Sequence, residues 1–260
     1  MKITEIENKD LKIEKIAMSC DKTITDTKGK TVAYPLMTTS SFILITGASG
    51  SGKSNLMISL LKGNKTTPDK KHKLSYNKMF DKVIYVSPSA GTIKNSPLEN
   101  ISDDQKHEAL TDEVFDQVEE IGEDAVEEGL HNLWILDDVS SQLRGQNENR
   151  LNQIVKNRRH KNLTIWIIAH KITDLSPKLR SNLSQGFFFK PKTNKEIDAI
   201  QTEYMLLSKK DADVVMASAF KTRYDFMLID SSLRNSAKFE FFRNFNRLVL
   251  DEEKEESDNK

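Results

Sequence analysis

Residues 42–54 read FILITGASGSGKS, an apolar run followed at once by a loop that carries three glycines. Glycine is costly in backbone entropy, so a loop that uses Gly47, Gly50 and Gly52 needs conformations or close approaches that other residues do not allow. The loop matches the spacing G-x-x-x-x-G-K-[ST], between an apolar strand and a helical pattern. In that setting consecutive backbone N–H groups face one anion at the positive end of a helix. The stretch therefore predicts a phosphate-binding loop.

The anion that this loop predicts is the triphosphate of a nucleotide. Lys53 supplies a positive charge for the β- and γ-phosphates, and the Ser54 hydroxyl is available to Mg²⁺. No N-K-x-D pattern of the guanine-reading type is evident, which favours ATP. We expect ATP and Mg²⁺ to bind together, with the nucleotide held by Gly47, Ala48, Ser49, Gly50, Ser51, Gly52, Lys53, Ser54 and Asn55.

A pair of carboxylates follows another apolar run, LWILDD at 133–138. Ligands of open α/β sheets bind outside the carboxyl ends of the strands, where Asp137 and Asp138 are expected to lie. We expect Asp137 to hold Mg²⁺ through water and Asp138 to orient the water that attacks the γ-phosphate. The competing interpretation is a solvated turn after a strand. The phosphate loop about 80 residues upstream favours the metal site.

The run LTIWIIAH (163–170) ends in a polar residue, His170. If this strand lies between the phosphate-loop strand and the Asp137 strand, His170 reaches the γ-phosphate and can sense it. The alternative is a hydrogen-bonded histidine with no role in turnover. Arg158, Arg159 and Arg180 are candidates for a guanidinium that stabilises the γ-phosphate from a neighbouring subunit. Arg158 and Arg159 also suit a helix end that complements its own dipole, and Arg159 and Arg180 rank above Arg158.

Strand and helix patterns alternate along the chain, and the strands are continuously apolar, which predicts a mainly parallel α/β sheet with helices on both faces. The segment 1–40 has one or two β-like stretches. Helices are expected directly after the glycine loop and at 111–130, where Val114, Phe115, Val118, Ile121 and Ala125 form an apolar stripe. The other expected elements are strands at 42–46, 82–89, 133–138, 163–170, 186–190 and 224–230 and helices at 149–160 and 195–208.

The net charge is zero, with 39 Lys and Arg against 39 Asp and Glu, which argues against a protein that coats nucleic acid generally. Basic residues gather at 62–78 and 156–161, so contacts to nucleic acid are expected to be local. No apolar run is long enough to cross a membrane. The first residues lack the apolar core of a secretory signal, and Cys20 is the only cysteine, so we expect an intracellular protein.

In this order, the glycine loop, LWILDD, RRHKNLTIWIIAH (158–170) and LSPKLRSN (175–182) resemble viral genome-packaging ATPases of the FtsK/HerA superfamily. The resemblance is greatest to the poxvirus-type branch of large DNA viruses, virophages and related elements. It covers roughly residues 40–190 and includes KVIYVSPSA at 82–90. Two positions depart from the pattern: relatives often have Glu where this chain has Asp138, and Gln where it has His170.

The resemblance implies a RecA-like P-loop NTPase core with extra strands at the termini. It implies a homo-oligomeric ring that hydrolyses ATP at subunit interfaces and drives double-stranded DNA, without sequence preference, into a capsid. Carried over by position, Lys53, Asp138, His170, Arg159 and Arg180 are the catalytic candidates, and Ser54 and Asp137 hold the metal. The expected location is the virion or the viral factory in the host cytoplasm.

Alternatives remain at this stage. A nucleoside or small-molecule kinase and a regulatory NTPase share the strand–loop–helix start. We expect an N-terminal extension (1–40), an ATPase domain (41–250) and an acidic disordered tail (251–260). Residues 99–129, which include most of the predicted 111–130 helix, are strongly acidic, and together with the acidic tail they either dock a capsid portal or keep the protein soluble. The 62–78 loop and Arg144 are candidate DNA contacts, or ordinary surface.

Overall fold

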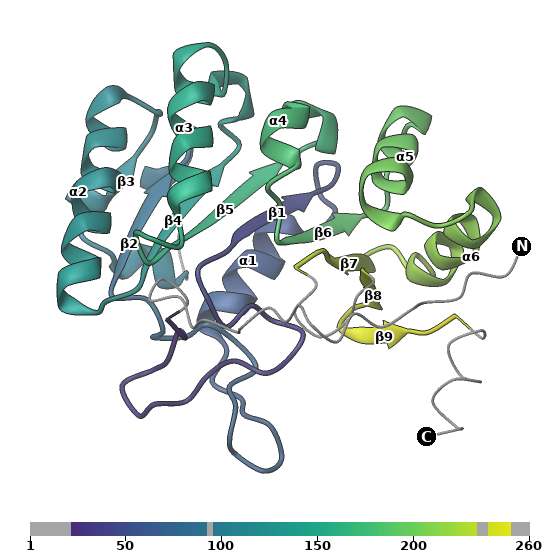
Figure 1. Ribbon diagram of the computed structural model, residues 1–260, viewed down its shortest axis with the longest axis horizontal. Helices are drawn as coiled ribbons and strands as arrows, with labels where there is room; N and C mark the ends of the chain where they lie inside the picture. The colour runs from purple at the N-terminus through teal and green to yellow at the C-terminus, as the bar shows by residue number, and fades with distance from the viewer. Residues whose placement is uncertain (1–21, 93–95, 233–238, 251–260) are drawn as a thin grey trace, which may run out of the picture.

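The computed structural model describes residues 22–92, 96–232 and 239–250. The predicted acidic tail and Cys20 lie outside these residues. One nine-stranded sheet runs through the molecule in the order β3-β2-β4-β5-β1-β6-β7-β8-β9 (Figure 1). The strands are β1 (Phe42–Thr46), β2 (Lys82–Val86), β3 (Lys106–His107), β4 (Asn132–Asp137), β5 (Leu163–Ala169), β6 (Gln185–Phe189), β7 (Phe226–Asp230), β8 (Glu240–Arg243) and β9 (Asn246–Leu248).

Neighbouring strands from β3 to β6 are parallel, whereas β7, β8 and β9 are joined antiparallel at one end. The mainly parallel sheet with added strands is therefore confirmed. The helices are α1 (Lys53–Lys62), α2 (Asp112–Glu128), α3 (Gln146–Asn157), α4 (Pro177–Arg180), α5 (Asn194–Ile200) and α6 (Lys209–Ala219). A π-helical turn, Gln201–Met205, continues α5.

Two hydrophobic clusters cover the two faces of the sheet. Alternate residues of β1 divide between them: Phe42 and Leu44 face the cluster that contains α2, α3 and α6, while Ile43 and Ile45 face the cluster that contains α1. Figure 1 shows α2, α3 and α4 in a row over one face and α1 on the other. The predicted apolar stripe of 111–130 is buried, as an amphipathic helix on a sheet requires.

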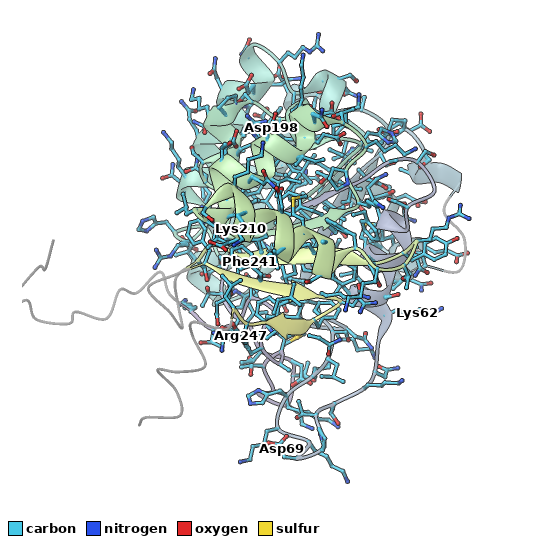
Figure 2. All side chains as sticks on the ribbon, turned by 90° about the vertical axis from the view of Figure 1, so that its right-hand side faces the viewer. Lys62, Asp69, Asp198, Lys210, Phe241 and Arg247 are labelled. Atoms are coloured by element: carbon cyan, nitrogen blue, oxygen red, sulfur yellow. The ribbon has the colours of Figure 1, made fainter. Side chains whose placement is uncertain are left out.

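The segment before β1 packs on the α1 face, although within 22–40 it forms isolated bridges rather than strands. Ile24, Val32, Leu36 and Met37 are buried there. The elements that the sequence pattern did not predict are the short strand β3, the β8–β9 hairpin and the helices α4 and α6. Phe241 of β8 belongs to the same buried cluster as Val215 and Met216 of α6, and Figure 2 shows the hairpin below this helix.

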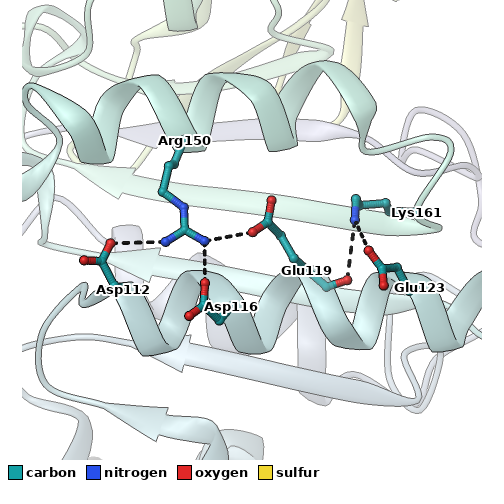
Figure 3. A network of polar contacts seen from close by, with 6 residues as sticks. All are labelled: Asp112, Asp116, Glu119, Glu123, Arg150 and Lys161. Carbon is teal, nitrogen blue, oxygen red and sulfur yellow. Dashed lines mark hydrogen bonds and ion pairs between the residues drawn. The ribbon is translucent and has the colours of Figure 1, made fainter.

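A polar network joins α2 to α3 (Figure 3). Arg150 of α3 forms ion pairs with Asp112, Asp116 and Glu119 of α2, at 3.1, 2.7 and 2.8 Å. Its guanidinium carbon also lies 4.8 Å from the centre of the Phe115 ring. One cation thus offsets part of the negative charge that crowds α2.

Candidate functional site

The glycine loop lies between the carboxyl end of β1 and the start of α1. Gly50 and Gly52 have φ angles of 72° and 110°, in a region that side-chain-bearing residues rarely adopt. Gly47 meets a different constraint: a Cβ on it would lie 2.6 Å from the Cβ of Phe189 and 2.7 Å from Ser51 Oγ. Both constraints explain why the loop needs glycine.

The loop has the properties of an anion site. Lys53 Nζ donates to the carbonyl oxygens of Gly47 and Ala48, at 2.6 and 3.2 Å, so the ammonium group lies inside the curve of the loop. The Ser51 hydroxyl is buried without a hydrogen-bond partner in the structure. Burial lowers the pKa of Lys53, and the negative charges of Asp137 and Asp138 partly restore it. The loop therefore fits a phosphate chain, which would give Lys53 and Ser51 new partners.

The strand order brings the acidic pair to the glycine loop. β5 lies between β1 and β4, with Thr46 paired to Ala169 and Asp137 paired to Ile168. The ends of β1, β4 and β5 therefore meet at one edge of the sheet, hereafter the nucleotide edge. Asp137, Asp138 and His170 all lie there, as the sequence predicted if β5 took this central place.

Tyr85 of β2 is a site residue that the sequence did not reveal. Its ring is buried, and its hydroxyl donates a hydrogen bond to Asp137 Oδ2 at 3.0 Å. Burial raises the pKa of Asp137, while the Tyr85 hydrogen bond and the Lys53 charge oppose that rise. Burial also raises the pKa of Tyr85, so its proton stays available to the carboxylate. A tyrosine in an otherwise aliphatic strand, KVIYV, was the only available signal.

Asp138 turns away from the strand into solvent. Its φ of 58° lies in the left-handed region, which Asp tolerates better than most residues. Asp138 Oδ1 lies 3.1 Å from His170 Nε2, and the two side chains are 59% and 47% exposed. The pair is thus open to water and to a ligand in the glycine loop. Both predicted roles of His170, sensor and strand-end partner, are compatible with this contact.

The arginine candidates lie elsewhere. Arg158 and Arg159 follow α3 and precede β5, so they are at the edge opposite the nucleotide edge. Arg158 donates to Val155 O and Ser184 Oγ, and burial lowers its pKa. Arg159 is exposed. Arg180 is 7% exposed and forms an ion pair with Glu203 at 2.7 Å. None of them meets the glycine loop of its own chain, so a finger role requires a second subunit.

The two candidate DNA contacts occupy opposite edges. Arg144 is exposed in the loop after Asp138, at the nucleotide edge. The 62–78 loop begins at the far end of α1 and leads to the amino end of β2. Figure 2 shows Asp69 of this loop at the lower extremity of the molecule. Lys65, Lys70, Lys71 and Lys78 are exposed.

The donors at the nucleotide edge suit magnesium. Mg²⁺ prefers oxygen ligands and is usually held by one or two carboxylates together with substrate phosphates. Ser54, which is exposed, and Asp137 are oxygen donors of this kind. Among the described residues no group of three or more His, Cys, Asp and Glu side chains is arranged to hold a metal without such help. In the same part of the chain no helix is long and apolar enough to cross a membrane.

Strand order, glycine loop and acidic pair together define a P-loop NTPase fold. Among solved structures, the chain is similar to B204, the genome-packaging NTPase of Sulfolobus turreted icosahedral virus 2, in complex with ATP-gammaS. The TM-score is 0.53 at 17% identity, over 82% of this chain and 100% of that one. It is also similar to B204, the DNA-packaging ATPase of Sulfolobus turreted icosahedral virus, with a TM-score of 0.53 at 17% identity, over 79% of this chain and 98% of that one.

At this identity the likeness establishes the fold, and the predicted α/β P-loop NTPase core is confirmed. No family model and no curated protein sequence matches this chain. The structural neighbours belong to the class of genome-packaging NTPases that the motifs resemble.

Proposed function

We propose that this chain is an ATP-hydrolysing motor that moves double-stranded DNA and packages a viral genome into a capsid. The observation that carries the proposal is the meeting of Lys53 with Asp137 and Asp138 at one sheet edge, close enough for the acid pair to affect the pKa of the lysine. The motifs and the likeness to B204, which covers that chain from end to end, favour packaging among the tasks of P-loop NTPases.

Each residue at the nucleotide edge has a role in hydrolysis under this proposal. The loop amides and Lys53 bind the β- and γ-phosphates. Ser54 and Asp137 would hold Mg²⁺, which neutralises phosphate charge when it is bound. Asp138 accepts a hydrogen bond from the attacking water and takes its proton as the new bond to the γ-phosphorus forms. The bond between that phosphorus and the bridging oxygen of the β-phosphate breaks, so that ADP and phosphate are the products. His170, 3.1 Å from Asp138, holds that carboxylate and responds to the presence of the γ-phosphate.

The motor acts as a homo-oligomeric ring in this proposal, located in the virion or the viral factory. Arg159 is exposed at the edge opposite the nucleotide edge, and from there it can reach a neighbouring subunit. Arg180 would first have to leave its ion pair with Glu203. DNA contacts are made to phosphates and carry no sequence information.

The test is phosphate release from ATP by the full chain, with and without duplex DNA. We expect release to increase when DNA is added, and we expect Lys53→Ala to reduce it by at least about 100-fold because the β/γ-phosphate charge loses its partner. The matched control is Lys209→Ala, an exposed residue at the start of α6, which should leave release unchanged. Circular dichroism of both variants checks the fold.

Two results would count against the motor. Transfer of phosphate to a nucleoside acceptor would support a kinase. Slow release that ignores DNA, with tight nucleotide binding, would support a regulatory NTPase.

A further inference from the structure

A second loop reaches the nucleotide edge from the side away from the acid pair. β6 is parallel to β1, and β7 runs back beside β6 with Phe226 paired to Phe189. The end of β6 and the start of β7 therefore lie at the same edge as the glycine loop. The segment 220–225, between α6 and β7, enters the sheet at this point.

Tyr224 in this segment is an exposed aromatic residue beside the glycine loop. It is 58% exposed, and a Cβ on Gly52 would lie 3.8 Å from its Cδ1 atom. The same Cβ would lie 3.3 Å from Cε1 of Phe189. The buried Phe189 ring and the exposed Tyr224 ring therefore both border Gly52. The guanidinium carbon of Arg223 is 5.2 Å from the centre of the Tyr224 ring. Two planar groups thus stand together next to the start of α1.

The backbone that carries Tyr224 is held firmly. The buried Asp225 accepts hydrogen bonds from the backbone N–H groups of Lys221 and Thr222, at 3.0 and 2.7 Å. It also accepts from Arg243 Nε at 3.0 Å and from Asn244 Nδ2 at 2.5 Å. Burial raises the pKa of Asp225, but these hydrogen bonds outweigh it and hold the pKa at about 2. The exposure of Tyr224 is therefore a feature of an anchored loop.

We propose that Tyr224, with Arg223 beside it, is the stacking platform for the base of the bound nucleoside triphosphate. This inference rests on the proposed nucleotide site. The acid pair lies on one side of β1, across β5, and Tyr224 lies on the other side, across β6. A triphosphate in the glycine loop with its γ-phosphate toward Asp138 therefore directs its nucleoside toward Tyr224. Aromatic and guanidinium planes both stack on bases without reading their edges.

The platform predicts a preference by ring size. A purine covers more of the Tyr224 ring than a pyrimidine does, so ATP and GTP bind more tightly than CTP and UTP. The platform itself selects weakly between the two purines, because stacking does not read hydrogen-bond donors and acceptors.

The test compares two probes, the non-hydrolysable analogue AMPPCP and inorganic tripolyphosphate, by calorimetry on the full chain. Tyr224→Ala should weaken AMPPCP about 10-fold and leave tripolyphosphate unchanged, since stacking on an aromatic side chain is worth that order of affinity. Tyr224→Phe should bind both probes like the parent. Tyr34→Ala is the matched control, because Tyr34 is 45% exposed and contacts Glu240 at the opposite edge of the sheet.

The outcomes separate the platform from the site itself. If Tyr224→Ala binds AMPPCP as the parent does, while Lys53→Ala binds neither probe, the phosphate site stands and the platform is wrong. An equal loss for both probes would also overturn the platform, since Tyr224 would then shape the phosphate loop. If the parent binds neither probe, the proposed function fails as well.

A second test adds a fluorescence signal at position 224, so that it does not rely on a loss of affinity. Tyr224→Trp places an exposed indole at the platform, whereas Trp134 and Trp166 are fully buried. AMPPCP should quench the new fluorescence and tripolyphosphate should not. Unchanged fluorescence at saturating AMPPCP would refute the stacking contact.

Discussion

The carboxylate of Asp137 is oriented by one hydroxyl, that of Tyr85 at 3.0 Å. Groups that orient a metal ligand commonly change metal affinity or activity by about 10- to 100-fold when they are removed. For Tyr85→Phe we expect the Mg²⁺ concentration that gives half-maximal phosphate release to rise about 10-fold, with a smaller change at saturating Mg²⁺. A Mg²⁺ titration of phosphate release measures this.

Tyr76→Phe is the control for that titration. Tyr76 is also buried, and its hydroxyl donates to the Met37 carbonyl oxygen at 3.0 Å, away from the acid pair. The Tyr76→Phe variant should be less stable than the parent but should need the same Mg²⁺ concentration for half-maximal phosphate release. Equal Mg²⁺ shifts in the two variants would mean that Tyr85 acts only through packing.

At the scale of single residues, the sequence predicted the members of the site that belong to a local pattern. Lys53, Ser54, Asp137 and Asp138 follow from short motifs whose spacing is fixed by one turn or one strand end. Tyr85 could not be predicted in this way, because its partner is 52 positions away in the chain. Only the register of β2 against β4 brings the two together.

At the scale of helices, α2 depends on α3 for charge compensation. Arg150→Ala leaves Asp112, Asp116 and Glu119 without their shared cation and removes the contact with Phe115. We expect a loss of about 1–2 kcal/mol in unfolding free energy, since the pairs are partly exposed and each contributes little. Urea unfolding at low salt measures the loss.

Salt provides the internal check. At 1 M NaCl the screening length falls to about 3 Å, so the loss of unfolding free energy caused by Arg150→Ala should be smaller than at low salt. Lys82→Ala is the control, because its single pair with Asp124 is 39% and 52% exposed and should be worth little at any salt. A deficit that does not depend on salt would assign the effect to packing on Phe115.

The loop before β7 depends on the ionised form of Asp225. Its pKa is about 2 in the folded chain against about 3.9 when unfolded, so its contribution is present above about pH 4 and is lost as the pH falls toward 2. Asp225→Asn should cost about 1–2 kcal/mol at pH 7. The difference in unfolding free energy between parent and variant should become smaller below pH 4. Urea unfolding at several pH values measures it. A gap that stays constant would show that the charge is not what stabilises the loop.

At the scale of elements, apolar periodicity predicted the central strands and the buried stripe of α2 correctly. It missed β3 and β9 because two or three residues are too few to show a period. It missed the role of the 220–225 loop for a different reason. The proposed role of that loop depends on its position beside the end of β6 and the glycine loop. No pattern within residues 220–225 indicates that position.

At the scale of the whole molecule, hydrolysis in a ring can be tested by mixing inactive subunits. If Arg159 acts on the neighbour's ATP, Arg159→Ala and Asp138→Asn chains are each inactive alone. In an equimolar mixture about one interface in four then combines an intact Asp138 with an intact Arg159. We expect phosphate release to recover to about that fraction of the parent rate.

The control mixture is Lys53→Ala with Asp138→Asn. Both residues belong to one site in one chain, so no interface regains a complete set and no recovery is expected. Recovery with Arg180→Ala in place of Arg159→Ala would assign the finger to Arg180. Absence of recovery in every mixture would argue against a shared site. The sequence supplied candidate arginines for such sharing but could not show which of them meets a second subunit, because contacts between subunits leave no periodic pattern within one chain.

The central position of β5 has a mechanical consequence. Its seven residues, Leu163–Ala169, are all buried and are held by ladders to β1 and β4, so the strand cannot bend or slide on its own. It is a rod about 20 Å long. His170 stands at one tip and the arginine-bearing turn 158–162 at the other. Under the proposed ring mechanism, a displacement of His170 caused by bound ATP would be transmitted along this strand to Arg158 and Arg159. The strand would then connect the nucleotide site of one subunit directly with the surface of the neighbouring subunit.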